Sequence, residues 1–391
     1  MEANKRTTMI YQLSDNIISS LGFTSDDNFN AVKQGISGLK LYENTFNIPE
    51  PFMASLIDNN ALNEAFLSIP SKHKISYTRF EKAAILSAYK ALEKTNIDPS
   101  SEKVLFILSS TKGNVELLDQ EKSKAYEPER VYLWRSAQLI TSFFENPNEA
   151  LVISNACISG AAAQLYAWRI LQNTDYEHVI VIGADLLSEF IISGFQSFKS
   201  LSTEICKPFD KNRCGLNLGE AVATVIYGKT DDISSLRENT IFLLSGAIAN
   251  DANHISGPSR TGAGLSIAIE KTLKDIDNNN ISFINAHGTA TPYNDDMESM
   301  AITATGLQHI PVNSLKGYTG HTLGAAGVLE TIISCKALSE NMILKSKGSE
   351  TPETVCPLHV LTANETSHKT YFLKLISGFG GCNAALAFRK K

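Results

Sequence analysis

The pattern that decides the fold of this chain occurs twice, as CISGAAAQL at residues 157–165 and as HTLGAAGVL at residues 321–329. Each copy follows a short β-like segment, at 151–154 and at 310–313, and opens a helix whose small residues permit close packing. The pattern predicts a duplicated half-domain with a reactive residue, cysteine in the first copy and histidine in the second, at the start of equivalent helices. A chance match among common small residues is the alternative.

Runs of aliphatic and β-branched residues alternate with helical patterns along the chain. Residues 104–108, 179–182 and 281–284 read VLFIL, VIVI and ISFI, which is typical of buried strands, and residues 80–94 have helical spacing. This alternation indicates an α/β protein. Because no proline-rich or glycine/serine-rich linker separates the two halves, we expect them to share an intimate interface.

Composition indicates a folded globular protein of 391 residues, with 43% hydrophobic and 19% charged residues. The formal net charge of -6 argues against nucleic acid as the main partner, because proteins that bind phosphate backbones carry a basic excess. Residues 1–20 lack the apolar core of a secretory signal, and apolar stretches elsewhere are shorter than the roughly 20 residues that span a bilayer. We therefore expect a cytoplasmic protein that does not enter membranes.

The six cysteines show no CxxC pairing, which favours reduced intracellular thiols over a disulfide framework or a zinc site. Cys157 differs from the others because it lies between a strand-like run and an alanine-rich helix. The helix dipole and unpaired N–H groups at such a position favour the thiolate. Cys157 is therefore a candidate nucleophile, and a small buried core cysteine is the alternative. The cysteines without an assigned role are Cys206, Cys214, Cys335, Cys356 and Cys382.

Two histidines lie in glycine-containing segments next to predicted strands or helices. His287 follows the strand-like run at 281–284, in the kind of loop where α/β proteins place ligands. A ring that only caps its loop is the structural alternative. His321 lies in a glycine-rich approach to the second copy of the repeated helix. Six further histidines receive no role: His73, His178, His254, His309, His359 and His368.

Glycine is concentrated once more at residues 377–383, which read SGFGGCN and follow a predicted strand at 371–376. Such a run lets the backbone approach a ligand and present N–H groups towards a developing negative charge. A plain turn between two C-terminal strands is the alternative.

Six motifs, taken together and in this order, resemble the β-ketoacyl-(acyl carrier protein) synthases, specifically the elongating branch with a Cys-His-His constellation. They cover most of the chain, which makes the resemblance far more specific than any single motif. They are SNACISGAA (154–162), GADLLSEFIISGFQSFKSLS (183–202), KPFDKNRCGLNLGEA (207–221), NAHGTATPYND (285–295), NSLKGYTGHTLGAAGVLE (313–330) and GFGGCNAAL (378–386).

The resemblance implies a thiolase-like fold, in which two similar α/β halves form a five-layered αβαβα arrangement. We expect the first half, residues 1–230, to carry the nucleophile and the second half, residues 231–391, to carry both histidines. The resemblance also implies a homodimer, or a heterodimer with a ketosynthase-like subunit, and acyl carrier protein as the partner that delivers substrate. No metal, flavin or nicotinamide is implied, because decarboxylation supplies the driving force.

The resemblance implies a role for each reactive residue. Cys157 would accept an acyl chain from a carrier thioester, with the N–H groups of Cys157 and Phe379 as oxyanion hole. Phe379 would also gate the acyl pocket. His287 and His321 would hold the malonyl thioester carbonyl during decarboxylation and stabilise the enolate that attacks the acyl group. Supporting roles are implied for Lys316, which orients the network, Glu330, its charge partner, and Thr289 and Thr291, which bind the pantetheine arm.

The region from 112 to 148 departs from the family pattern, although in the family it covers the acyl tunnel and shapes the dimer contact. Chain-length preference and the choice between fatty acid and polyene or polyketide synthesis therefore stay open. Carrier proteins are acidic and this chain is also net negative, so docking requires a local basic patch. The candidates for this patch are Arg79, Lys82, Lys207, Lys211 and Arg213.

Two other functions compete with that of a condensing synthase. A non-catalytic chain-length-factor subunit resembles these enzymes, but such subunits typically lack the nucleophile. A thiolase that cleaves β-ketoacyl-CoA generally needs a second reactive cysteine near the C-terminus, for which Cys382 is the candidate. The GFGGCN context of Cys382 resembles the ketosynthase gate instead.

Overall fold

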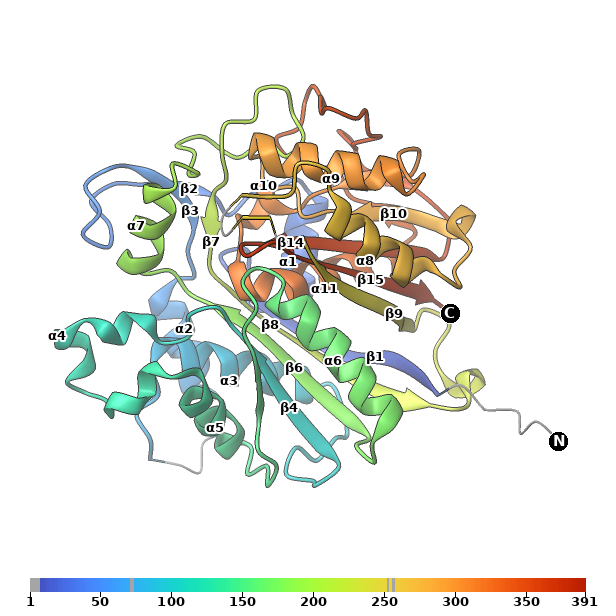
Figure 1. Cartoon of the computed structure of the whole chain (residues 1–391). Helices are drawn as coiled ribbons and strands as arrows, with labels where there is room; N and C mark the ends of the chain where they lie inside the picture. Colours follow the sequence, from blue (N-terminus) through green and yellow to red (C-terminus); the bar gives the residue numbers. More distant parts are fainter. Residues whose placement is uncertain (1–7, 71–73, 252, 255–256) are drawn as a thin grey trace.

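The chain folds around one sheet of 10 strands, and the computed structural model describes residues 8–70, 74–251, 253–254 and 257–391. The strands of this sheet are β1 (Met9–Ser19), β4 (Val104–Ser109), β5 (Leu151–Ile153), β6 (His178–Asp185), β8 (Ala221–Thr230), β9 (Ile241–Asn250), β10 (Ile281–Asn285), β11 (Val312–Asn313), β14 (Tyr371–Gly378) and β15 (Cys382–Lys390). Their order is β11-β10-β14-β15-β9-β1-β8-β6-β4-β5 (Figure 1).

The sheet shows the same sequence of parallel and antiparallel strand pairs when it is followed inward from either end. Strands β5, β4 and β6 are parallel, and β8 and β1 continue antiparallel. In the same way β11, β10 and β14 are parallel, and β15 and β9 continue antiparallel. The two halves join where β1 pairs with β9. The expected duplication is therefore real, and we retain the division into residues 1–230 and 231–391 as a proposal.

Helices cover both faces of each half and also fill the layer between the halves. The helices are α1 (Ser25–Lys33), α2 (Asn59–Leu67), α3 (Arg79–Leu92), α4 (Gln120–Ser123), α5 (Leu133–Phe143), α6 (Ser159–Asn173), α7 (Glu189–Ser197), α8 (Ala263–Leu273), α9 (Pro292–Ala304), α10 (Lys316–Thr319) and α11 (Ala326–Ser339). Helices α2, α3 and α5 pack outside the first half, and α8 and α9 outside the second (Figure 1). Because α6 and α11 contact strands of both halves, the layers follow the expected αβαβα order.

The continuous apolar runs of the strands follow from this layering. In β4, Val104, Phe106 and Leu108 pack against the outer helices, whereas Leu105 and Ile107 face the central layer. Alternate side chains of a strand point to opposite faces, so a strand covered on both sides is apolar throughout. The predicted strands at 104–108, 179–182 and 281–284 are confirmed for this reason.

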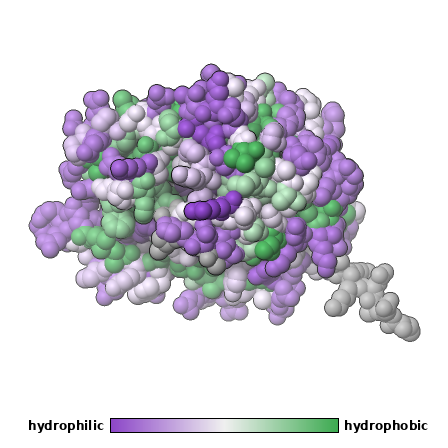
Figure 2. Space-filling view, turned by 45° about the horizontal axis from the view of Figure 1, so that its top comes forward, coloured by the Kyte–Doolittle hydropathy of each residue, from purple (hydrophilic) through white to green (hydrophobic). Residues whose placement is uncertain are grey.

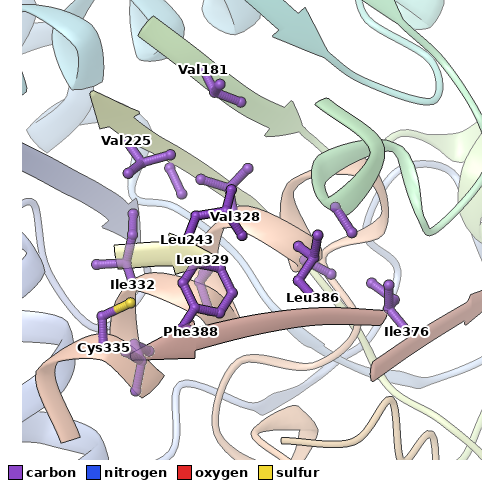
Figure 3. Close-up of a cluster of buried hydrophobic side chains, with 14 of the residues drawn as sticks. Val181, Val225, Leu243, Val328, Leu329, Ile332, Cys335, Ile376, Leu386 and Phe388 are labelled. Atoms are coloured by element: carbon purple, nitrogen blue, oxygen red, sulfur yellow. The ribbon is translucent and has the colours of Figure 1, made fainter. Parts of the chain in front are cut away.

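The central layer joins the two halves through small residues. A Cβ atom at Gly160 of α6 would lie 2.9 Å from the carbonyl oxygen of Gly324 and 3.0 Å from the nitrogen of Val328, so only glycine allows this approach. Around the contact, side chains of α11 such as Leu329 meet strands of both halves (Figure 3). The repeated motif therefore marks the line along which the halves pack.

The two ends of the sheet are finished differently. The β11 end is covered, because Val312 exchanges backbone hydrogen bonds with residues 359–361. At the other end β5 is the last strand, and its side chains are half-buried. Two small sheets lie apart from the main one. They consist of β2 (Lys40–Tyr42), β3 (Phe52–Ser55) and β7 (Leu218–Gly219), and of β12 (Met342–Ile343) and β13 (Glu365–Thr366).

Apolar residues form only small patches between polar ones on the face shown in Figure 2. Within the described part of the chain, none of the helices combines the length and the apolar character needed to cross a membrane.

Candidate active site

Cys157 lies on a sharp turn between β5 and α6. The preceding residue, Ala156, has a φ of 44°, a left-handed conformation that is strained for a residue with a side chain. The hydroxyl of Ser159 holds the turn by donating to the Ala156 carbonyl (2.6 Å) and accepting from the Asn155 N–H (2.8 Å). The turn leaves the Cys157 side chain buried, with 7% of the residue exposed.

His321 comes from the other half of the chain and touches this sulfur. Its Nε2 lies 3.0 Å from Sγ of Cys157. The N–H of Leu323 donates to Nδ1 of the same ring at 3.3 Å, which assigns the ring proton to Nε2 in the neutral form. In this tautomer His321 donates a hydrogen bond to the Cys157 sulfur.

His287 completes a cluster of three side chains. Its ring lies 5.0 Å from that of His321, centroid to centroid, with an angle of 84° between the planes. One ring nitrogen of each histidine and the Cys157 sulfur all lie within 4.8 Å of one another. The carboxylate of Glu298 accepts the N–H groups of His287 and Gly288, each at 2.7 Å, and so fixes the loop that carries His287.

The electrostatics of this cluster are dominated by burial. Burial raises the pKa of Cys157 to about 12, with a further increase from Cys382, while Lys316 and the Phe379 N–H act in the opposite direction. Burial therefore opposes the thiolate that the position at the helix start was expected to favour. Burial and the charge of Lys316 lower the pKa of His287 and of His321 well below the usual value, so both rings are neutral.

Two cavities meet at Cys157. One, of about 340 Å³, is lined by Cys157, both histidines, Thr289 and Thr291. The hydroxyls of these two threonines lie 2.8 Å apart. The other, of about 740 Å³, is mostly apolar and extends from Cys157 towards Phe190 and the start of the 112–148 region. The buried Cys157 thus borders a cavity on each of two sides.

Comparison with known families decides the identity of this arrangement. Residues 28–232 match the N-terminal domain of β-ketoacyl synthases, and residues 242–349 match their C-terminal domain. The chain belongs to the β-ketoacyl synthase family. The predicted family, the thiolase-like fold and the acyltransferase class are confirmed by this match and by the relatives that follow.

The relatives of this synthase include 3-oxoacyl-(acyl-carrier-protein) synthase 2 of Staphylococcus aureus (strain COL), which is 28% identical over 351 residues, 82% of this chain and 84% of the relative. The protein of the same name from Coxiella burnetii (strain RSA 493 / Nine Mile phase I) is 32% identical over 261 residues, 63% of this chain and 62% of the relative.

Solved structures show the same fold. The ishigamide ketosynthase/chain length factor has a TM-score of 0.87 and 23% identity over 98% of this chain and 100% of its own. A ketosynthase in complex with its chain length factor from Xenorhabdus doucetiae has a TM-score of 0.86 and 24% identity over the full length of both chains.

The glycine-rich turn of the synthase joins β14 to β15, as a plain turn would, and it also approaches Cys157, while its role as an oxyanion donor stays a prediction. The N–H of Phe379 lies near enough to the Cys157 sulfur to lower the pKa of that thiol. A Cβ atom at Gly378 would lie 3.1 Å from the nitrogen of Cys157. The Phe379 ring stacks on Phe195 (5.7 Å) and meets Phe198 edge-on (5.5 Å), where the two cavities join. The ring therefore has the position that a gate requires.

A buried ionic cluster contributes to lowering the pKa of both histidines. Lys316 donates to one oxygen of Glu330, as predicted, and Lys374 donates to the other oxygen at 2.5 Å. Sequence reasoning missed Lys374, although a lysine in the apolar run YFLKLIS is a detectable signal. It also missed Glu298, because its position on α9 next to the His287 loop depends on the tertiary fold.

The docking candidates divide into two groups. Arg79 is paired through both guanidinium nitrogens with buried Glu220, and Arg213 is paired with Asp296. Each of these two arginines already has a carboxylate partner, and their docking role stays a prediction. The other three candidates are lysines. Lys82 donates a hydrogen bond to Asn63 and Lys207 pairs with Glu204, whereas Lys211 is exposed.

Proposed function

We propose that the chain is a β-ketoacyl-(acyl carrier protein) synthase that joins an acyl group on Cys157 to malonyl-carrier with loss of carbon dioxide. The single observation that carries this proposal is the contact of 3.0 Å between Nε2 of His321 and the Cys157 sulfur, at the point where two cavities meet. A condensing enzyme needs one nucleophile that two thioesters reach in turn.

In the first step the Cys157 sulfur attacks the carrier-bound acyl thioester. The carbonyl oxygen becomes negative and is held by the N–H groups of Cys157 and Phe379. The carbon–sulfur bond to the carrier then breaks, and the departing pantetheine thiol takes the proton from Cys157. The acyl chain passes the Phe379 ring and lies in the larger cavity, whose apolar lining suits a hydrocarbon chain.

In the second step malonyl-carrier occupies the smaller cavity, where Thr289 and Thr291 bind the pantetheine arm. His287 and His321, both neutral, donate N–H groups to the thioester oxygen. Loss of carbon dioxide turns the malonyl group into an enolate, whose carbon attacks the acyl carbonyl on Cys157. The sulfur leaves as a thiolate, held by Nε2–H of His321, and is protonated afterwards.

Acyl carrier protein is the partner that this mechanism requires, and exposed Lys211 together with Lys82 and Lys207 would attract its acidic surface. We also propose a second subunit, either another copy or a ketosynthase-like chain. Strand β5 ends the sheet with its outer edge available for pairing. Leu118 and Phe190, which line the larger cavity, are 64% and 57% exposed, as expected for a wall that a second subunit completes. We place the enzyme in the cytoplasm and assign it no metal or organic cofactor.

The 112–148 region, which departs from the family pattern, contributes Val115 and Leu118 to the lining of the larger cavity. This contribution supports a specialised acyl substrate. A panel of acyl-carriers that differ in length and unsaturation distinguishes fatty acid synthesis from polyene or polyketide synthesis.

The competing functions receive less support. A non-catalytic chain-length factor does not need the intact cluster of Cys157, His287 and His321. For a thiolase, Cys382 would have to face the substrate, but its sulfur hydrogen bonds with the Phe379 carbonyl (3.3 Å). Among the described residues that line the two cavities, Cys382 is absent.

The test is a reaction of the purified chain with malonyl-carrier and a panel of acyl-carriers that differ in length and unsaturation. We expect release of carbon dioxide and a carrier-bound 3-oxoacyl product for one class of chain, with the homologous subunit added in a parallel series. Transfer of the acyl group to free coenzyme A would establish a thiolase instead. Activity only when a second, catalytically complete subunit is added would establish a chain-length factor.

A further inference from the structure

Lys374 occupies a position that the strand pattern reserves for an apolar residue. Its neighbours on the same face of β14, Phe372 and Ile376, belong to the hydrophobic central layer, and Lys374 itself is fully buried. An apolar side chain of similar length would continue the packing without the cost of removing an ammonium group from water. Stability alone therefore does not explain a lysine at this position.

The contacts of Lys374 connect it to Glu330, the charge partner of Lys316. Its Nζ donates to Glu330 (2.5 Å) and to the carbonyl oxygen of Leu375 (2.9 Å), while Lys316 donates to the second oxygen of Glu330. Two ammonium groups share one carboxylate, so the cluster has one net positive charge. Without Lys374, the pair of Lys316 and Glu330 would be neutral.

We propose that Lys374 is a positioning residue for the condensation: the positive charge that it adds near His287 and His321 acts together with burial and Lys316 to keep both imidazoles neutral, and it favours the negatively charged enolate that they bind. This inference rests on the proposed function. It assigns to Lys374 a role that acts through the histidines and the field of the cluster, without contact with the substrate.

The charged and titratable groups that interact with Lys374 come from several elements and determine the sign of the effect. The charged groups are Glu330 on α11, Lys316 on α10 and Glu298 on α9, and the titratable groups include the two neutral histidines. Lys374 and Lys316 each lower the pKa of both histidines. Burial lowers the pKa of Lys374 itself to about 8, so the side chain is charged at neutral pH and loses its charge in alkaline solution.

The experiment measures decarboxylation of malonyl-carrier and condensation as functions of pH in the wild type, Lys374→Met and Lys374→Arg. The acid limb of the pH profile is the range in which the rate falls as the pH decreases and the histidines take up protons. In Lys374→Met we expect this limb to move to higher pH by about one unit, because the histidines bind protons more readily when a nearby positive charge is removed. At neutral pH we expect kcat to fall roughly tenfold with little change in KM.

Two features separate this role from a structural one. The difference between the wild type and Lys374→Met should disappear above about pH 8, where Lys374 loses its own charge. Lys374→Arg keeps a permanent charge, so its acid limb should stay in place and its rate should not decline in that range. A merely structural lysine predicts a deficit that is constant with pH.

A double variant tests the charge directly and covers the case in which Lys374→Met does not fold. Lys374→Met combined with Glu330→Gln leaves Lys316 as the only charge, so the net charge of the cluster is again one positive. Its acid limb should return towards that of the wild type. Unchanged acid limbs in folded Lys374→Met and in the double variant would overturn the inference. An inactive wild type would overturn the proposed function instead.

Discussion

The two halves of the molecule present the same turn to each other and place different chemistry on it. In the first half Cys157 precedes α6, and in the second His321 precedes the equivalent α11. The glycines that let these helices touch also bring the sulfur and the imidazole to hydrogen-bonding distance. The comparison teaches that the two halves share one geometry. In the proposed mechanism, the single residue that differs at the equivalent positions makes one half the source of the nucleophile and the other the source of its hydrogen-bond donor.

The strands that pass these two turns, β6 and β14, also end in different residues. Strand β6 ends at Asp185, whose carboxylate accepts the N–H of Gly324 (2.6 Å) beside the His321 turn. Strand β14 ends at Gly378, which carries no side chain where it passes the nitrogen of Cys157. A carboxylate closes the turn of the second half, and a glycine leaves the N–H of the first half accessible to an oxyanion.

The largest effect is expected when the second half loses its donor. His321→Ala removes the hydrogen bond to the Cys157 sulfur and one donor to the enolate, so condensation should fall on the order of 10³-fold or more. Product formation from acyl-carrier and malonyl-carrier measures this. His309→Ala, at an exposed histidine, is the matched control and should keep full activity. Equal loss in both variants would disconnect His321 from the chemistry.

His287→Ala should separate the two histidines. Only His321 is hydrogen bonded to the sulfur, so His287→Ala should still accept the acyl group on Cys157 but decarboxylate malonyl-carrier about 10²-fold more slowly. Intact mass reports the first step, and carbon dioxide release reports the second. If His287→Ala and His321→Ala both failed to accept the acyl group, the two histidines would act together in acylation.

Gly160→Ala tests the packing of the halves. Its Cβ atom would lie 2.9 Å from the Gly324 carbonyl oxygen, so the free energy of unfolding should decrease by about 1–3 kcal/mol. Denaturant unfolding measures the change. Gly194→Ala in α7 meets no atom within 4 Å and serves as the control, with little change or a slight gain expected. Equal stability of both variants would show that the helices can separate without cost.

The smallest effect is expected at the strand end that passes the nucleophile. Gly378→Ala places a methyl group 3.1 Å from the nitrogen of Cys157, and condensation should fall about tenfold. The same methyl group would lie 3.0 Å from the Cys382 sulfur. The double variant with Cys382→Ala relieves that second contact alone, so it should remain as slow as Gly378→Ala. Recovery of the rate would assign the defect to packing against Cys382.

The features that the sequence predicted are those that depend on local pattern. The strands at 104–108 and 281–284 and the pair of repeated helices were readable, because alternation and small-residue spacing reflect burial directly. The resting state of Cys157 was not readable, since its pKa is decided by burial from distant segments. The partners of Arg79 and Arg213 lie far along the chain for the same reason. Lys374 left a signal, a charge in an apolar strand, but its partner Glu330 became evident only from the fold.

The most direct test of the account is the mass of the intact protein after incubation with acyl-carrier, compared between Cys157→Ala and Cys382→Ala. Both cysteines are buried near the same turn, but only Cys157 lines the cavities in the described structure. We predict that the wild type and Cys382→Ala gain the mass of one acyl group and that Cys157→Ala gains none. An acyl group that persists in Cys157→Ala would contradict the central claim that this sulfur, contacted by His321 from the other half, is the nucleophile.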